Sequence, residues 1–237
     1  MSIKVAHLHK TYGSQHAVDD ISFTVNPGEI VGFLGPNGAG KSTTMKMITG
    51  FLKPDEGTIS VCDIPVSTNN THTKTKIGYL PESNALYYDL YVKEYLDFVA
   101  DVHGIIHKKE AIEKVLDEVG LSPEAGKKIG QLSKGYKQRV GLAAAIIHDP
   151  EVLILDEPTT GLDPNQIMEI REVIKKLGQH KTVLFSTHIL QEVEAICNRV
   201  IIIHKGKVVA DGGLEILLEK SPDNTLESLF RSLTNPQ

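Results

Sequence analysis

The chain has 237 residues, 41% hydrophobic and 23% charged, a balance typical of a soluble globular protein with one large domain. Its net charge of −5 argues against a general nucleic-acid or anionic-membrane surface, and its two cysteines, Cys62 and Cys197, are too few and too far apart for a disulfide framework. The N-terminus lacks a signal-peptide pattern, and no apolar run approaches the roughly 20 residues of a membrane-spanning helix. If the protein works at a membrane, we expect another chain to supply the membrane part.

Short strands and turns dominate the first third of the chain. Alternation of apolar and polar side chains, or β-branched content, predicts five strands: residues 2–10, 17–25, 29–34, 57–62 and 76–80. The turn signal Asn26-Pro27-Gly28 precedes the third strand, and a helix is predicted over residues 43–48. A polar connection through residues 69–71 leads to the fifth strand.

The third strand and the helix after it flank a stretch that fits G-x-x-x-x-G-K-[ST], the pattern of a phosphate-binding loop. Its residues are Gly35, Pro36, Asn37, Gly38, Ala39, Gly40, Lys41, Ser42 and Thr43. Glycines let successive backbone N–H groups turn inward around anionic oxygens, and the helix aims its positive end at them. Lys41 adds a charge for the β- and γ-phosphates, and the Ser42 hydroxyl can ligate Mg²⁺. An ordinary glycine-rich turn would not account for the flanking strand and helix, so we predict nucleotide binding.

From about residue 91 the apolar residues follow a helical period. They recur at helical spacing over residues 92–102 and again over residues 112–119. This helical block, roughly residues 82–149, is predicted to be an insertion within an otherwise alternating strand–helix fold.

The last third of the chain returns to alternating strands and helices. The pattern predicts a strand at residues 152–155, a helix at 167–177, a strand at 182–185, a helix at 189–198, a hairpin of 200–203 with 207–210, and two short amphipathic helices at 214–218 and 226–233.

Together these elements predict an α/β fold, a P-loop NTPase core with a mixed β-sheet and an inserted α-helical subdomain. The predicted boundaries are residues 1–81 and 150–212 for the core, about 82–149 for the helical subdomain and about 213–233 for the C-terminal helices.

Two carboxylates, Asp156 and Glu157, close the strand predicted at residues 152–155. The carboxyl end of a parallel strand is where α/β sheets bind their ligands. Asp156 is placed to hold Mg²⁺, and Glu157 is placed to accept a proton from an attacking water. In isolation, two exposed carboxylates capping the turn at Pro158 would be the simpler interpretation. The phosphate loop favours the functional one.

His103 and His107 are four residues apart, a spacing used by zinc sites on helices. Gly104 interrupts the helix, however, and no acidic or cysteine partner stands in register. We therefore expect solvent-facing histidines at a helix end and no zinc site.

Four further motifs follow the phosphate loop in a fixed order: Leu132–Arg139, Ile154–Thr159, Gly161–Asp163 and Ser186–His188. This ordered set resembles the ATP-binding subunits of ABC transporters, and the match covers essentially the whole chain. The details are most similar to the exporter branch that pairs with ABC-2-type membrane subunits. Within that branch, the stretch from residues 77–82 through residues 91–96 resembles bacterial gliding-motility-associated transporter ATPases.

The resemblance implies roles for two residues near the nucleotide. Tyr12 looks like the aromatic residue that stacks on adenine, although a surface tyrosine in a turn is an equally good interpretation of the sequence alone. His188 looks like the histidine that hydrogen-bonds the γ-phosphate and the attacking water. A structural histidine is the alternative, and its place after an apolar strand favours the functional role.

Three other residues, by the same resemblance, act across a dimer. Ser133 and Gly135 look like the signature that contacts the γ-phosphate of ATP held by the other subunit, with a helix over residues 137–148 supplying its dipole. Asp163 looks like the residue that reaches across the dimer. A helix cap by Ser133 and an N-cap by Asp163 before Pro164 are structural interpretations compatible with these roles.

The chain departs from the family pattern at two places. Glu82 stands where the family usually has Gln, and a carboxylate can ligate a metal but, when ionised, cannot donate a hydrogen bond to water. Lys134 and Tyr136 stand where the commonest signature has Gly and Gln, while Gly135 is retained. We expect a working site with altered side-chain contacts.

The resulting prediction is an ATP-binding and ATP-hydrolysing subunit of an ABC transporter, with ATP and Mg²⁺ as cofactors. The expected Mg²⁺ ligands are Ser42, Asp156 and Glu82, with Glu157 as the base. ATP would join two subunits head to tail, and hydrolysis would drive export through a separate integral-membrane ABC-2-type permease contacted just after Glu82. We expect a cytoplasmic protein, peripheral on the inner face of the membrane, with no nucleic-acid partner.

Two alternatives belong to other classes. A soluble ABC ATPase acting on ribosomes or DNA usually carries two such domains, a long coiled coil or a basic arm, and this sequence has none. A P-loop kinase or GTPase would leave the signature and His188 without a role. The sequence names neither the cargo nor whether the working pair is a homodimer or a heterodimer.

Overall fold

The central element is a six-stranded mixed β-sheet. The computed structural model describes residues 1–221 and 223–234. In spatial order the strands are β10 (Lys207–Gly213), β9 (Arg199–His204), β3 (Ile30–Leu34), β8 (Thr182–Thr187), β7 (Val152–Asp156) and β6 (Ile77–Leu80). All neighbours are parallel except β9 and β10, which form the predicted hairpin. Every residue of β7 and β8 is buried because both faces of the sheet are covered.

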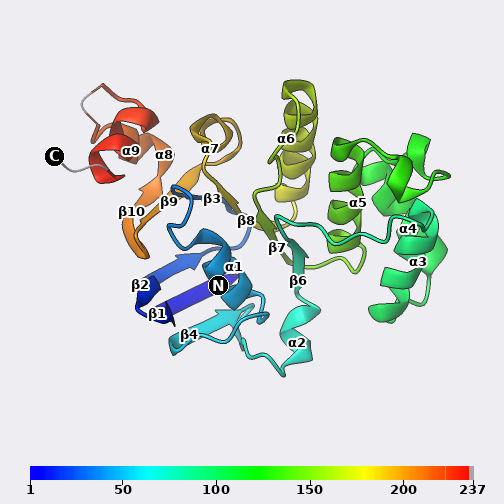
Figure 1. The fold of residues 1–237 in the computed structure, drawn as a ribbon, viewed down its shortest axis with the longest axis horizontal. Coiled ribbons are helices and arrows are strands. Elements are labelled where there is room, and N and C mark those ends of the chain that lie inside the picture. The colour runs from blue at the N-terminus through cyan, green and yellow to red at the C-terminus, as the bar shows by residue number, and fades with distance from the viewer. Residues whose placement is uncertain (222, 235–237) are drawn as a thin grey trace.

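A second sheet, of four antiparallel strands, lies beside one face of the first (Figure 1). Its order is β2 (Gln15–Val25), β1 (Ile3–Tyr12), β4 (Glu56–Val61) and β5 (Ile64–Pro65). The sequence predicts most of these strands but does not separate them from the main sheet. β5 and the short helix α2 (Thr71–Lys74), which Asn70 caps by accepting the His72 N–H at 3.0 Å, were not predicted.

Two hydrophobic cores cover the two faces of the main sheet. One lies against the antiparallel sheet and helix α1 (Lys41–Ile48), and it contains Ile154 of β7. The other lies on the opposite face and contains Leu153 and Leu155. Successive residues of a strand point to opposite faces, so this one short strand supplies both cores.

Helices form three further groups. The first group, α6 (Pro164–Gly178) and α7 (Leu190–Ile196), lies over the second core. The helical block contains α3 (Val92–Val102), α4 (Lys108–Glu118), the 3₁₀ turns η1 (Ser122–Glu124) and η2 (Ile129–Gln131), and α5 (Lys134–Ile146). The C-terminal helices are α8 (Leu214–Leu218) and α9 (Leu226–Thr234). The helical block and the C-terminal helices lie at opposite ends of the molecule (Figure 1). Among the described residues, no helix combines the length and the apolar content needed to cross a bilayer.

Helix α5 begins three residues earlier than predicted. Its N-cap is Ser133, whose hydroxyl accepts the N–H of Tyr136 at 3.3 Å, and the helix ends at Ile146 rather than His148. The cap therefore places Gly135 inside the first turn, so the signature residues are part of the helix end and do not merely precede it.

Candidate active site

The phosphate-binding loop connects β3 to α1 and packs tightly against the rest of the core. Gly40, the N-cap of α1, has φ of 108°, and a Cβ at this position would collide with the carbonyl oxygen of Ala17. A Cβ on Gly35 would collide with the carbonyl oxygen of Ile203. Only glycine fits either place, and α1 has no side-chain cap on its first N–H groups. This helix end therefore has the properties of an anion-binding site.

Lys41 is the cation of this loop, and its side chain is only 5% exposed. The Nζ donates to the carbonyl oxygens of Gly35 at 2.8 Å and Pro36 at 3.3 Å, and it lies 3.2 Å from Glu157 Oε1. These contacts hold the ammonium group between the loop and the end of β7.

Asp156 is buried beneath the phosphate loop and joins it to two strands. Its Oδ1 accepts the hydroxyl of Ser42 at 3.1 Å and the hydroxyl of Ser186, the β8 residue paired with it in the sheet, at 2.5 Å. The Ser186 hydroxyl in turn accepts the N–H of Glu157 at 3.1 Å. One buried serine therefore aligns both carboxylate residues.

Glu157 also lies inside the protein, so the interpretation of two exposed carboxylates is wrong. Asp156 is 2% exposed and Glu157 is 5% exposed. The backbone of Glu157 has φ of 50°, an uncommon conformation for a residue with a side chain. Its Oε2 lies 2.9 Å from Nδ1 of His188 and accepts the Thr160 hydroxyl at 3.3 Å. The predicted base and the predicted histidine are therefore direct neighbours.

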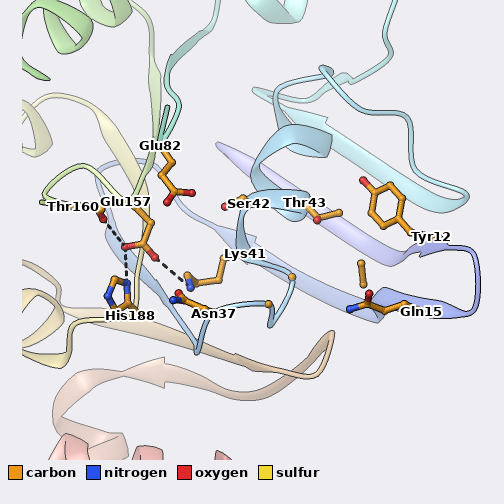
Figure 2. Close-up of a pocket in the computed structure, with 13 residues that line it drawn as sticks. Tyr12, Gln15, Asn37, Lys41, Ser42, Thr43, Glu82, Glu157, Thr160 and His188 are labelled. Carbon is orange, nitrogen blue, oxygen red and sulfur yellow. Dashed lines mark hydrogen bonds and ion pairs between the residues drawn. The ribbon is translucent and has the colours of Figure 1, made fainter. Parts of the chain in front are cut away.

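Lys41, Ser42, Glu157 and His188 line one cavity with a volume of about 610 Å³. Its lining residues are Tyr12, Gln15, Ala17, Asn37, Gly38, Gly40, Lys41, Ser42, Thr43, Glu82, Glu157, Thr160 and His188. Figure 2 shows Tyr12 and Gln15 at one end, Glu157, Thr160 and His188 at the other, and Lys41 between them. From one end to the other the cavity thus offers an aromatic surface, a phosphate-binding loop and a carboxylate, which is the spatial order that a nucleoside triphosphate requires.

Tyr12 is a surface tyrosine that also lines the cavity, and this position is compatible with either interpretation of the sequence. Its side chain is 51% exposed, with the Nζ of Lys10 5.8 Å from the ring centroid. Sequence reasoning missed Gln15, Ala17 and Thr160. Gln15 pairs with Tyr12 across the β1–β2 turn, so an antiparallel pairing of the first two predicted strands would have placed it beside the aromatic ring.

The oxygen donors in and beside the cavity fit magnesium. Ser42 and Glu82 line the cavity, Asp156 accepts the Ser42 hydroxyl, and all three offer only oxygen, which Mg²⁺ prefers. Within the described ranges no group of three or more His, Cys, Asp or Glu side chains is arranged to hold a metal ion by itself. Such a site suits a cation held by one or two carboxylates together with substrate phosphates. Burial raises the pKa of the Tyr79 hydroxyl, and the nearby charges of Asp156 and Glu82 raise it further. Asp156 and Glu82 thus both lie near the Tyr79 hydroxyl.

The signature residues do not share this cavity. Ser133 and Gly135 line a separate hollow of about 160 Å³ with Gln166, whose side-chain carbon would lie 2.7 Å from a Cβ on Gly135. Asp163 lines neither space. It caps α6, accepting the N–H groups of Asn165 and Gln166 at 3.0 Å each. Both predicted helix caps are confirmed, and within one chain the signature is apart from the phosphate loop.

Comparison with known proteins identifies the family. The sequence profile of the ABC transporter family matches residues 18–160, more than half of the chain. The chain is 44% identical over 211 residues to the bacitracin transport ATP-binding protein of Bacillus licheniformis, covering 88% of this chain and 69% of that protein. It is 40% identical over 237 residues to the linearmycin resistance ATP-binding protein of Bacillus subtilis, covering 98% of this chain and 76% of that protein. It is also 40% identical over 220 residues to a Nod factor export ATP-binding protein of Burkholderia pseudomallei, covering 92% of this chain and 72% of that protein.

Solved structures agree with this assignment. An ATP-binding subunit of an ABC transporter matches with a TM-score of 0.87 at 32% identity, covering 98% of this chain and 99% of that one. A dimeric ATP-binding cassette in a post-hydrolysis state, bound to ADP and Pi, matches with a TM-score of 0.80 at 27% identity (89% and 98%). The chain therefore belongs to the ABC transporter family, as its ATP-binding and ATP-hydrolysing subunit.

Proposed function

We propose that Glu157 is the general base of ATP hydrolysis and that His188 holds the γ-phosphate and the attacking water. The buried carboxylate of Glu157, with Lys41 3.2 Å from one oxygen and His188 2.9 Å from the other, is the observation that carries the proposal. It lies at the end of the cavity opposite Tyr12, which we propose stacks on adenine (Figure 2).

The reaction follows from this arrangement. As the water oxygen bonds to the γ-phosphorus, the bond from that phosphorus to the β,γ-bridging oxygen breaks, and a proton of the water passes to Glu157. Lys41 and the N–H groups at residues 35–43 stabilise the charge on the phosphate oxygens. Bound Mg²⁺ would add positive charge at the β- and γ-phosphates, with Ser42, Asp156 and Glu82 as its protein ligands.

A complete site needs two chains, on this proposal. Ser133 and Gly135 line a different hollow from the phosphate loop, so they reach a γ-phosphate only when a second copy presents them. The core (1–81 and 150–212) and the helical subdomain (82–149) would then contribute opposite halves of each site, with Asp163 at the contact. ATP would stabilise the closed pair, and hydrolysis would release it.

The partner that converts closure into export is, we propose, an ABC-2-type permease. A solved relative is described as part of an ABC transporter complex, and the names of the curated relatives include bacitracin transport and Nod factor export. A hollow of about 450 Å³ lies just beyond Glu82, lined by Pro81, Tyr95 and Phe51, which is 78% exposed. An intracellular segment of the permease would dock there, holding the chain on the cytoplasmic face of the membrane. The similarity to gliding-motility ATPases stays a hypothesis about subfamily.

Replacing Glu157 with Gln tests the assignment of the base. Gln keeps the shape but cannot take the proton, so we expect ATP turnover to fall by about a hundredfold or more while ATP binding persists and an ATP-bound dimer accumulates. The measurements are phosphate release and size-exclusion chromatography with light scattering, with and without Mg²⁺-ATP. Glu172→Gln on α6, at a side chain 73% exposed, is the matched control. Turnover at the wild-type rate in Glu157→Gln would show that another group is the base.

A further inference from the structure

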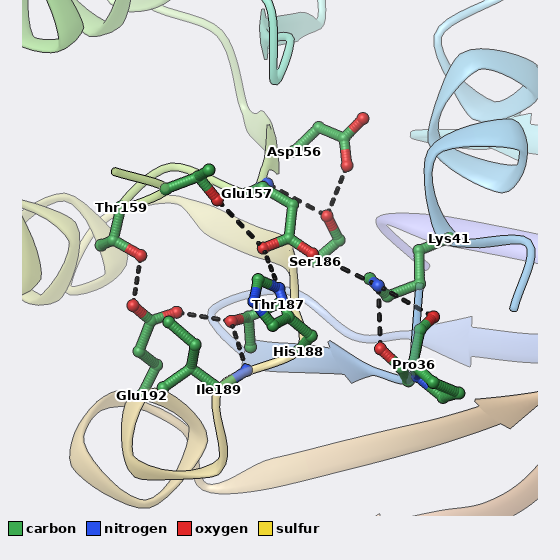
Figure 3. Close-up of polar contacts among 12 residues, drawn as sticks. Pro36, Lys41, Asp156, Glu157, Thr159, Ser186, Thr187, His188, Ile189 and Glu192 are labelled. Atoms are coloured by element: carbon green, nitrogen blue, oxygen red, sulfur yellow. Dashed lines mark hydrogen bonds and ion pairs between the residues drawn. The ribbon is translucent and has the colours of Figure 1, made fainter. Parts of the chain in front are cut away.

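Glu192 is a fully buried acidic residue that the mechanism above does not use. It lies in the first turn of α7 with 0% of its surface exposed. Its Oε1 accepts the hydroxyl of Thr159, and its Oε2 accepts the hydroxyl of Thr187 at 2.6 Å (Figure 3). Within residues 1–221 and 223–234, no ion pair involves this carboxylate.

The two threonines belong to the loops that carry the proposed catalytic groups. Thr159 follows Glu157 by two residues, where the chain leaves β7. Thr187 is the last residue of β8 and directly precedes His188. The strands are parallel neighbours, and Asp156 with Ser186 is their last pair. The last backbone hydrogen bond between these segments runs from the N–H of Glu157 to the carbonyl oxygen of Ser186 at 3.2 Å. Further along, the Glu192 carboxylate bridges the two loops.

The bridge also fixes the backbone on both sides of His188. The Thr187 hydroxyl that donates to Glu192 accepts the N–H of Ile189 at 3.0 Å. His188 is thus held between two tied residues while its ring contacts Glu157. A displacement of either loop would change the distance of 2.9 Å between His188 Nδ1 and Glu157 Oε2.

Stability alone gives a poor account of this residue. A buried acid without a cationic partner loses its hydration, and a well-packed apolar side chain at the same place is often neutral or stabilising. A carboxylate does what an apolar side chain cannot, because its two oxygens accept from two loops at once. The contacts of Glu192 therefore favour a role in positioning the two loops over a role in packing the core.

We propose that Glu192 is a positioning residue for ATP hydrolysis, whose carboxylate fixes the loops of Glu157 and His188 relative to each other. Glu192 does not line the nucleotide cavity, so it acts through these loops and not on the nucleotide. The inference rests on the catalytic roles proposed above for Glu157 and His188.

Two variants remove the bridge from opposite sides. Glu192→Ala removes the acceptor, and Thr159→Val removes one donor at nearly constant volume. A displacement of about 1 Å can cost on the order of a hundredfold in rate, so we expect kcat to fall by about tenfold or more in each variant, with KM for Mg²⁺-ATP within about twofold of wild type. Glu192→Gln retains one acceptor oxygen and should give an intermediate kcat. Glu194→Gln, at an exposed position two residues further along α7, should match wild type.

The double variant separates positioning from packing. Because both changes break the same bridge, Glu192→Ala with Thr159→Val should lose about as much kcat as the worse single variant, not the product of the two losses. If Glu192→Ala fails to fold, Glu192→Gln with Thr159→Val completes the same cycle. Lower melting temperatures with wild-type kcat per folded molecule would overturn the proposal, as would a rise in KM with kcat unchanged.

The catalytic assignment is judged separately. Wild-type turnover in Glu157→Gln would refute the base whatever the Glu192 variants do. Reduced turnover in Glu157→Gln together with wild-type kcat in Thr159→Val and Glu192→Gln would refute only the positioning role.

Discussion

His148 should make the stability of the folded chain fall on mild acidification. Its ring lies against the first residue of β6, with Nε2 3.1 Å from the carbonyl oxygen of Ile77. A carbonyl only accepts, so Nε2 carries the hydrogen and Nδ1 is the remaining acceptor. Nδ1 is buried with no hydrogen-bond partner in the part of the chain that the structure describes. A second proton would therefore be buried without an acceptor.

The surroundings of the ring also oppose its protonation. All causes together lower the pKa of His148 to about 4, and burial is the largest of them. His103, stacked on it at 3.9 Å between ring centroids, contributes to this lowering, as does Lys181. The hydrogen bond to Ile77 and the charge of Asp149 raise the pKa, but each effect is smaller than that of burial or of His103.

The sign and the size of the effect follow from proton linkage. Below about pH 6.5 His148 binds a proton in the unfolded chain, whereas in the folded chain it binds one only when the pH approaches about 4. The contribution of His148 to the free energy of unfolding is therefore complete above pH 6.5 and is lost as the pH falls from 6.5 to about 4. For these two values, linkage gives a loss of about 2 kcal/mol between pH 7 and pH 5. The ring is only partly buried, so solvent screening reduces our expectation to about 1 kcal/mol.

Urea unfolding at pH 7, 6 and 5 measures this loss. His148→Gln keeps an N–H for the Ile77 carbonyl but does not titrate, so the wild type should lose about 1 kcal/mol more than this variant between pH 7 and pH 5. His107→Gln, at a side chain 79% exposed, is the control and should follow the wild type. Equal losses in wild type and His148→Gln would refute the reasoning, because other titrating groups would then account for the whole pH dependence.

Two further predictions concern the nucleotide cavity. Gly40→Ala should lower the free energy of unfolding by about 2–5 kcal/mol, because its methyl group would meet the Ala17 carbonyl oxygen at a positive φ. Gly38 also has a positive φ but has nothing within 4 Å of a Cβ, so Gly38→Ala should lower the free energy of unfolding by only about 1–2 kcal/mol. Equal losses for the two variants in urea unfolding would refute the clash at Gly40. Glu82→Gln should raise kcat at saturating Mg²⁺-ATP, because an amide can donate to water and removes a negative charge beside the phosphates, while the exposed control Glu110→Gln should not. A lower kcat in Glu82→Gln would mean that the carboxylate is a required ligand.

Much of the fold was predictable because its signals are local. The burial of β7 on both faces appears in the sequence as an uninterrupted apolar run, and the N-caps Ser133 and Asp163 are set by the few residues that follow them. The separate antiparallel sheet was not predictable in the same way, because β1 pairs with β4 across more than forty residues of chain. Alternation alone shows that a strand is half-buried but not which partner it has.

The same distinction between local and long-range signals applies to the candidate active site. The sequence by itself determined the phosphate loop and the order of the motifs, since a positive φ at Gly40 and a lysine after it are properties of consecutive residues. Only the tertiary structure decided that Asp156 and Glu157 are buried, that Lys41 and His188 contact opposite oxygens of Glu157, and that Glu192 ties the two loops together. These contacts depend on β7 and β8 lying side by side, which is a long-range pairing that hydrophobic burial selects and no local pattern encodes.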